Sequence, residues 1–239
     1  MNEEIEEILT IIAEKAQLAE GIEGVRSILL TMYRFPSLKN KKVSQKTGVA
    51  IPALAAVRGE LVKAGIIEKK NFLGENGRTW IRENLNLKFE YDPLPNNFDS
   101  FLTEIPEEFV SIKKIEEILS TRPKPNFALD QSHAISSTVV KRALYLLKKG
   151  DIEGKKIIFL GDDDATSLAV GLLNLAEEIT VVDIDLNVIR FLSENANNLS
   201  LKNFEVISHD LRDPCPTNIL NNYDVVVMDP PYTLSLIHI

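Results

Sequence analysis

Acidic residues follow each of four short apolar segments in the second half of the chain. Each segment has the composition of a buried strand, and the carboxyl ends of parallel strands meet at one edge of a sheet, where ligands bind. Carboxylates gathered there would repel one another unless a cation compensated them. The sequence therefore predicts a site for a cationic ligand, formed by Gly161, Asp162, Asp163, Asp164, Asp183, Asp210 and Asp229.

Two of these acids are placed to contact a nucleoside. Asp183 lies about twenty residues beyond the first turn, where a carboxylate can hold both hydroxyls of a ribose. Asp210 and Leu211 follow the third segment and are candidates for the edge and the face of an adenine. The alternatives are an ordinary loop carboxylate for Asp183, and a cap or a pair with Arg212 for Asp210.

The segment Asp229-Pro230-Pro231-Tyr232 follows the fourth apolar run directly. Two prolines restrict the backbone and remove two amide donors, so the Pro230 carbonyl can act as an acceptor beside the Asp229 carboxylate. Together these groups can bind the hydrogens of an amine, and the Tyr232 ring offers a face to a base or a cation. A purely structural Pro-Pro turn is the alternative.

The elements that must position these residues alternate between strands and helices. Ser136 can cap a helix that ends at about Lys149. Continuous apolar strands that alternate with helices indicate an α/β, Rossmann-like parallel sheet of the methyltransferase type, covered on both faces. We expect strands at 156–160, 179–182, 204–207 and 223–228, and helices at 166–176 and 186–197.

The first 90 residues predict a separate winged helix-turn-helix domain. Four helices are expected at 3–20, 22–33, 43–48 and 51–65, with Pro52 in a first turn and Gly65 at a helix end. Segments 66–70 and 78–82 flank the turn-rich residues 73–77, which predicts a hairpin. Residues 91–127 form an Asn/Pro-rich linker with one helix at 106–119, and residues 128–233 form the Rossmann-like domain.

The front domain carries basic residues that could contact phosphates: Arg58, Lys63, Lys69, Lys70, Arg78 and Arg82. A solvated basic face explains them equally well, and few side chains of the helix at 51–65 suit base-edge contacts. We therefore favour an accessory role, such as homodimerisation, in which nucleic-acid binding is possible but not required.

Charge is distributed unevenly along the chain. Residues 1–90 carry fourteen Lys and Arg against twelve Asp and Glu, and residues 91–239 carry thirteen against twenty-three. The acidic second part argues against a polyanion in its site and favours a polycation. One cysteine, no secretory leader and no apolar run of membrane-spanning length predict a cytoplasmic protein without disulfides or membrane contact.

A ribose-binding acid, an adenine-binding acid and Asp-Pro-Pro-Tyr, in this order, resemble transferases that use sulfonium donors to alkylate amines. In the amino-methyltransferases the first turn is glycine-rich, because helix amides must approach the carboxylate of S-adenosylmethionine. Asp162 to Asp164 would repel that carboxylate, whereas decarboxylated S-adenosylmethionine keeps only its positive groups. The sign of this interaction favours the decarboxylated co-substrate.

From Phe127 to Thr233 the chain resembles the branched-chain polyamine synthase family, the bis(aminopropyl)spermidine synthases. The resemblance rests on Gly-Asp-Asp-Asp at 161–164 together with Asp-Pro-Pro-Tyr at 229–232. It implies transfer of aminopropyl groups from decarboxylated S-adenosylmethionine to the central nitrogen of spermidine, with no tightly bound cofactor and no metal. The implied roles are catalysis for Asp162, Asp229, Pro230 and Tyr232, donor binding for Gly161, Asp163, Asp164, Asp183, Asp210 and Leu211, and acceptor binding for Asp130 and Gln131.

Two other functions remain open from the sequence: an amino-methyltransferase of DNA or RNA, and a polyamine-sensing transcription regulator. A sheet of this type needs strands beyond the fourth, so we expect the Rossmann-like domain to be truncated. The last six residues, 234–239, match a translated sequencing adapter, which predicts that they are an artefact.

Overall fold

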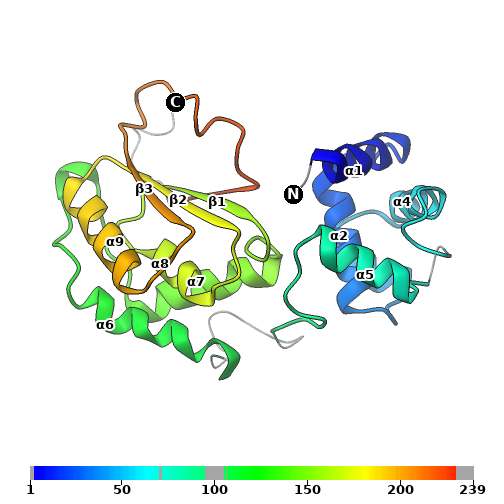
Figure 1. Cartoon of the computed structure of the whole chain (residues 1–239), viewed down its shortest axis with the longest axis horizontal. Coiled ribbons are helices and arrows are strands. Elements are labelled where there is room, and N and C mark those ends of the chain that lie inside the picture. Colours follow the sequence, from blue (N-terminus) through cyan, green and yellow to red (C-terminus); the bar gives the residue numbers. More distant parts are fainter. Residues whose placement is uncertain (1–2, 70–71, 95–104, 106, 230–239) are drawn as a thin grey trace. The chain divides into compact units, whose positions relative to one another are not determined.

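A computed structural model of the chain describes residues 3–69, 72–94, 105 and 107–229. The chain forms two compact units, Met1–Asn96 and Asn97–Ile239, which are described separately (Figure 1). The boundary falls within the Asn/Pro-rich region that the sequence predicts to separate two domains.

The described part of the first unit contains five helices: α1 (Glu3–Lys15), α2 (Gly21–Arg34), α3 (Asn40–Thr47), α4 (Ile51–Lys63) and α5 (Glu75–Asn84). Their apolar faces share one core, which includes Leu9, Leu29, Leu54 and Ile81. The first four helices confirm the prediction. Gly48 caps α3 with a left-handed φ of 77°, and Pro52 lies in the first turn of α4.

The predicted hairpin is wrong. Helix α5 occupies residues 78–82, where a strand was expected. In the described part of this region, the β pairing is limited to a single bridge between Lys69 and Phe72. The glycines serve packing rather than a turn: Gly74 precedes the helix in an extended conformation, and a Cβ at Gly77 would lie 2.6 Å from the Ile66 carbonyl oxygen. The described residues therefore form a helical unit without the predicted wing.

Four of the basic residues considered for phosphate binding make side-chain contacts inside the first unit, among them Lys63, which donates a 2.6 Å hydrogen bond to Glu60. Arg78 donates a 2.9 Å hydrogen bond to the Tyr33 carbonyl and lies over the Tyr33 ring. Arg58 is buried and donates to Asn40, while Arg82 lies 3.6 Å from Glu90. These contacts support the structural interpretation of the residues. Lys70 lies outside the described residues.

The predicted linker helix is present and forms part of the second unit. It consists of a 3-10 segment, η1 (Glu107–Lys114), and α6 (Ile115–Leu119). The Ser111 hydroxyl donates to the Leu172 carbonyl (3.3 Å), and Ile112 and Ile115 are fully buried. A second 3-10 segment, η2 (Phe127–Leu129), leads into α7 (Ser136–Lys149). Ser136 does not cap α7 as predicted, because it is the first helical residue and Ile135 takes the capping position.

The described part of the second unit contains a sheet of four parallel strands: β1 (Lys156–Leu160), β2 (Glu178–Asp183), β3 (Phe204–Ser208) and β4 (Val225–Met228). Their order is β3-β2-β1-β4, so the chain moves outward from β1 in one direction and then returns to its other side. The register aligns Leu160 with Val182 and with Met228. The residues that follow these three positions therefore emerge together at one edge, as predicted.

Helices α8 (Thr166–Leu173) and α9 (Leu186–Asn198) pack against each other and against β2, below the sheet in Figure 1. On the other face, Ile219 and Tyr223 of the β3–β4 connection cover Ile158 and Val182. The predicted helical cover on both faces is therefore not found in the described residues. Because β4 is an outer strand of the described sheet, Val226 and Met228 are 57% and 55% exposed.

Candidate active site

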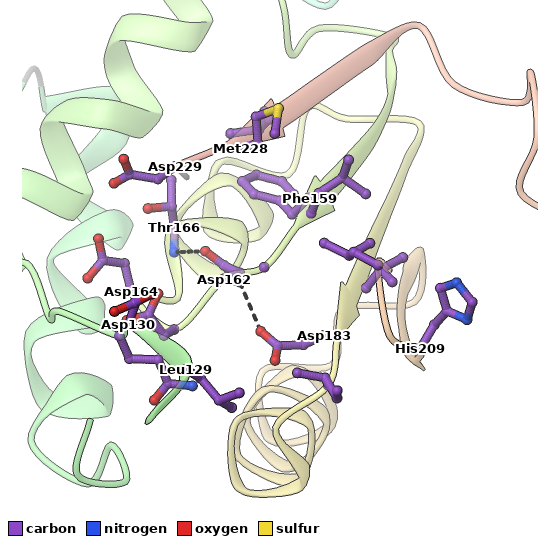
Figure 2. A pocket seen from close by; sticks show the side chains of 18 of the residues that line it. Leu129, Asp130, Phe159, Asp162, Asp164, Thr166, Asp183, His209, Met228 and Asp229 are labelled. Atoms are coloured by element: carbon purple, nitrogen blue, oxygen red, sulfur yellow. Dashed lines mark hydrogen bonds between the residues drawn. The ribbon is translucent and has the colours of Figure 1, made fainter. Parts of the chain in front are cut away.

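A cavity of about 490 Å³ lies at the carboxyl ends of β1, β2 and β4 (Figure 2). The turns after the strands form one side, and residues from η2 and α7 form the other. Phe159, Val182, Val227 and Met228 give it an apolar floor. Every acid that the sequence placed in the site, within the described residues, lines it: Asp130, Asp162, Asp163, Asp164, Asp183, Asp210 and Asp229.

Asp162 caps helix α8. Its two carboxylate oxygens accept hydrogen bonds from the amides of Thr166 (2.8 Å) and Ser167 (3.0 Å), and its own amide donates to Asp183 (3.1 Å), as the dashed lines in Figure 2 show in part. Burial raises the pKa of Asp162 to about 8, although the helix amides favour the charged form. Both oxygens thus have partners within the protein, which gives Asp162 a structural role in addition to the predicted catalytic one.

Asp163 is half-buried and accepts a 3.2 Å hydrogen bond from the Ser132 amide. Burial, together with the nearby charge of Asp164, raises its pKa to about 6. Its carboxylate faces the cavity with a single hydrogen bond from the backbone of another segment. Of the three consecutive acids, Asp163 is therefore the one best placed to gain from an added cation.

Asp164 is buried between two arginines. Its carboxylate accepts from the Ala134 amide and from Arg142 (2.6 Å), and Arg122 lies 3.7 Å away. Arg122 also donates to the carbonyls of Asp164 and Ala134. Asp164 therefore ties the segment before α7 to the turn after β1.

Arg142 bridges two of the predicted site acids. One guanidinium nitrogen lies 2.6 Å from Asp164, and the other lies 2.6 Å from Asp229 at the end of β4. Arg142 is not among the site residues predicted from the sequence. Arg142 lies on α7 one residue before Ala143 and three residues after Val139, and both of these residues are buried. This spacing places Arg142 at the inward edge of the helix, which is the feature of the sequence that could have indicated a role in the site.

The turn after β2 is held by backbone hydrogen bonds to carboxylates. Asp183 is buried and accepts from the amides of Asp162 and Asp185 (2.8 Å), while Asp185 caps α9 through the Asn187 amide. Gln131 donates to Asp185 (3.0 Å), and its amide oxygen accepts from the backbone N–H of residue 126. Gln131 thus fixes the loop, whereas the neighbouring Asp130, in a left-handed conformation, is exposed at the cavity.

Asp210 pairs with Arg212 at the cavity wall, which is the alternative left open by the sequence. The Arg212 side chain approaches both carboxylate oxygens, the shorter contact being 2.6 Å, and it lowers the pKa of Asp210 to about 2. Leu211 is 51% exposed beside it. The adenine-binding roles of Asp210 and Leu211 remain predictions.

Pro230, Tyr232 and the segment 234–239 lie outside the described residues. Among residues 3–69, 72–94, 105 and 107–229, no group of three or more His, Cys, Asp and Glu side chains is arranged to hold a metal ion. In that same part of the chain, no helix has the length and apolar character needed to cross a membrane.

The order β3-β2-β1-β4 and the cavity at the carboxyl ends place the second unit in the class of Rossmann-like α/β proteins. The family model for the branched-chain polyamine synthase A C-terminal domain matches residues 110–239, which is more than half of the chain. The chain belongs to this family, whose members are transferases.

Similarity to individual proteins extends over both units. An uncharacterized protein of Methanocaldococcus jannaschii is 35% identical over 232 residues, which cover 95% of this chain and 59% of the relative. The N(4)-bis(aminopropyl)spermidine synthase of the same organism is 39% identical over 123 residues, covering 52% of this chain and 35% of that protein. The matched part of the chain therefore spans less than two thirds of the length of each of these relatives.

The crystal structure of the Thermus thermophilus branched-chain polyamine synthase, in complex with N4-aminopropylspermidine and 5'-methylthioadenosine, has a similar fold. Its TM-score is 0.51 at 21% identity, and the match covers 94% of this chain and 64% of the other. At this identity the similarity is evidence for the fold alone.

Proposed function

We propose that the protein transfers aminopropyl groups from decarboxylated S-adenosylmethionine to the central secondary amine of spermidine. Asp183, Asp210 and Leu211 would bind the adenosine part of the donor. Asp130 and Asp163 would bind primary ammonium groups, and Asp229, with the predicted Pro230 carbonyl, would orient the attacking amine. Methylthioadenosine and a branched polyamine are the products.

The observation that carries this proposal is that the first amides of α8 already donate hydrogen bonds to Asp162. In a nucleotide-type site the first amides of this helix are available to an anionic group. Here the Asp162 carboxyl group accepts from Thr166 and Ser167, so those amides already have acceptors within the protein. Asp163 adds a second carboxylate at the same turn. The carboxylate of intact S-adenosylmethionine would find no free donors at these amides and would be repelled by ionised Asp163, whereas the decarboxylated donor would not.

The size of this repulsion is sufficient to select a donor. Two unit charges about 4 Å apart interact by about 4 kcal/mol at an effective dielectric constant of about 20. Solvent in the open cavity reduces that value, and even about 1.4 kcal/mol corresponds to a tenfold preference. We therefore expect donor selection to be visible in binding as well as in turnover.

The proposed transfer is a substitution at the carbon next to the sulfonium. The lone pair of a neutral secondary amine forms the new C–N bond while the C–S bond breaks, and the electrons of that bond leave with sulfur as the neutral thioether. The positive charge of the sulfonium passes to the new ammonium. The amine must first lose the proton that it carries in neutral water, because a protonated amine has no lone pair to donate.

The names of the relatives support the same substrates. One is called an N(4)-bis(aminopropyl)spermidine synthase, and the crystallised synthase of similar fold contains an N4-aminopropylated spermidine with methylthioadenosine. Both molecules correspond to the products of the reaction proposed here.

The test measures donor binding and turnover on the whole chain. Isothermal titration with decarboxylated and with intact S-adenosylmethionine should show at least about tenfold tighter binding of the decarboxylated donor. With spermidine present, mass spectrometry should detect methylthioadenosine and a polyamine heavier by one or two aminopropyl groups. Preferential binding of intact S-adenosylmethionine, or methyl transfer to DNA or RNA, would refute the proposal.

A further inference from the structure

Within the described residues, Arg142 pairs with Asp229, the acid that the proposed function assigns to the attacking amine. Its two terminal nitrogens lie 2.6 Å from Asp164 and 2.6 Å from Asp229. Its side chain is 40% exposed, whereas that of Asp164 is only 9% exposed. The buried carboxylate therefore anchors one end of the guanidinium and directs the other toward the cavity edge.

Asp164 does not depend on Arg142 alone. The Ala134 amide and Arg122 also contact its carboxylate. This second set of partners leaves the Arg142 charge available to Asp229. A guanidinium is planar and keeps its charge at any working pH, so it can hold two carboxylates in a fixed geometry.

The charged and titratable groups around Arg142 come from four elements. Asp163 and Asp164 follow β1, Asp229 follows β4, Tyr145 lies one turn further along α7, and Arg122 precedes η2. Asp162 also acts on Arg122, and His133 lies near Arg122 and Asp164, while the two carboxylates that pair with Arg142 itself are Asp164 and Asp229. Without Arg142 the net charge of the groups near Asp229 would be more negative by one unit.

This net charge affects the pKa of an amine bound at Asp229. A lone carboxylate favours the protonated amine, which cannot attack, whereas a guanidinium beside the carboxylate opposes this effect. Asp229 can then accept a hydrogen bond from the amine without holding it in the ammonium form. This resolves the conflict between orienting the nucleophile and keeping its lone pair available.

We propose that Arg142 is a positioning residue for the transfer: it fixes the Asp229 carboxylate and, through its charge, keeps the attacking amine neutral. This inference rests on the proposed function. The site is partly exposed, so solvent weakens the interaction. We expect Arg142 to lower the pKa of the bound amine by about one unit, which is about a tenfold change in its neutral fraction.

The test follows the bound amine directly. Spermidine labelled with ¹⁵N at its central nitrogen is bound to the whole chain together with methylthioadenosine, which has no aminopropyl group to transfer. The ¹⁵N chemical shift is then followed as a function of pH. We expect the pKa of the bound central amine to be about one unit higher in Arg142→Gln than in the unchanged chain.

Two further variants separate charge from structure. Lys148→Gln removes a positive charge from the same helix outside the cavity and should leave the amine pKa unchanged. Arg142→Lys keeps the charge but loses the planar bridge, and it should restore most of the effect. Circular dichroism checks that each variant is folded.

The outcomes distinguish the inference from the proposed function. Failure of the unchanged chain to bind spermidine would refute both. Binding with equal amine pKa values in the unchanged chain and in Arg142→Gln would refute the inference alone, as would an amine pKa in Arg142→Lys as high as that in Arg142→Gln.

Discussion

Replacing Asp163 by Asn should stabilise the protein near neutral pH. In the folded chain the pKa of Asp163 is raised from 3.8 to about 6 by burial and by the charge of Asp164. The ionised carboxylate is therefore less favourable in the folded state than in the unfolded state. Asparagine keeps an oxygen that can accept from the Ser132 amide, and it removes the charge.

The magnitude follows from the pKa difference. A shift of about two units corresponds to about 3 kcal/mol at about 1.36 kcal/mol per unit. Because Asp163 is only half-buried, solvent screening reduces this figure, and we expect about 1.5 kcal/mol. The variant should gain this much in the free energy of unfolding at neutral pH.

The dependence on pH has a definite sign. Below pH 3.8 the carboxyl group is protonated in both states and contributes nothing. As the pH rises from 3.8 to about 6, the unfolded chain ionises first, so the unchanged protein loses stability relative to the variant. Above about pH 6 the difference is constant.

Urea unfolding near pH 4 and near pH 7.5 would measure this difference. Asp213→Asn, which removes the same charge from an exposed position outside the cavity, is the matched control. A stability difference that is equal at the two pH values, or an Asp163→Asn chain less stable than the unchanged one at the higher pH, would refute the reasoning. Spermidine should reduce the difference, because a bound cation stabilises the ionised Asp163.

Three other substitutions test the assignments of structural roles. Asp162→Ala should lower the free energy of unfolding by about 1–2 kcal/mol, since two amides of α8 lose their cap, and Asp162→Asn should lose less; equal values for the two variants would contradict the capping role. Gln131→Ala should cost about 1–3 kcal/mol because a buried oxygen of Asp185 loses its donor, and calorimetry should show a lower melting temperature with unchanged affinity for methylthioadenosine. Gly161→Ala should cost only about 1 kcal/mol in urea unfolding, because φ is +74° but no atom lies within 4 Å of the added Cβ; a cost several times larger would mean a steric conflict.

The second unit could be predicted well from the sequence because its signals are local and agree with one another. Each strand is a short apolar run that ends in a polar turn, and a helix follows each of the first two strands. The hairpin of the first unit was mispredicted because Gly74 and Gly77 have two possible meanings. A glycine required by a turn and a glycine required by close packing look the same until its neighbour, here the Ile66 carbonyl, is known.

For the site as well, the positions of the residues could be predicted from the sequence, but their contacts could not. The sequence located the acids at the strand ends, because that follows from the register of a parallel sheet. It could not give the direction of a carboxylate, so it could not show that Asp210, which also lines the cavity, has its charge compensated by Arg212. Arg142 was missed because it reaches the strand ends from a helix that precedes the first strand.

The three consecutive acids therefore do not act as one patch of charge. Asp162 takes the helix amides, Asp164 anchors Arg142, and Asp163 faces the cavity with a raised pKa. The charge offered to a ligand by this turn is thus closer to one unit than to three. Donor selection then depends on two features: the α8 amides are not available to bind an anion, and Asp163 supplies a negative charge. This explains how the cavity can disfavour a carboxylate without the instability that three adjacent unpaired carboxylates would cause.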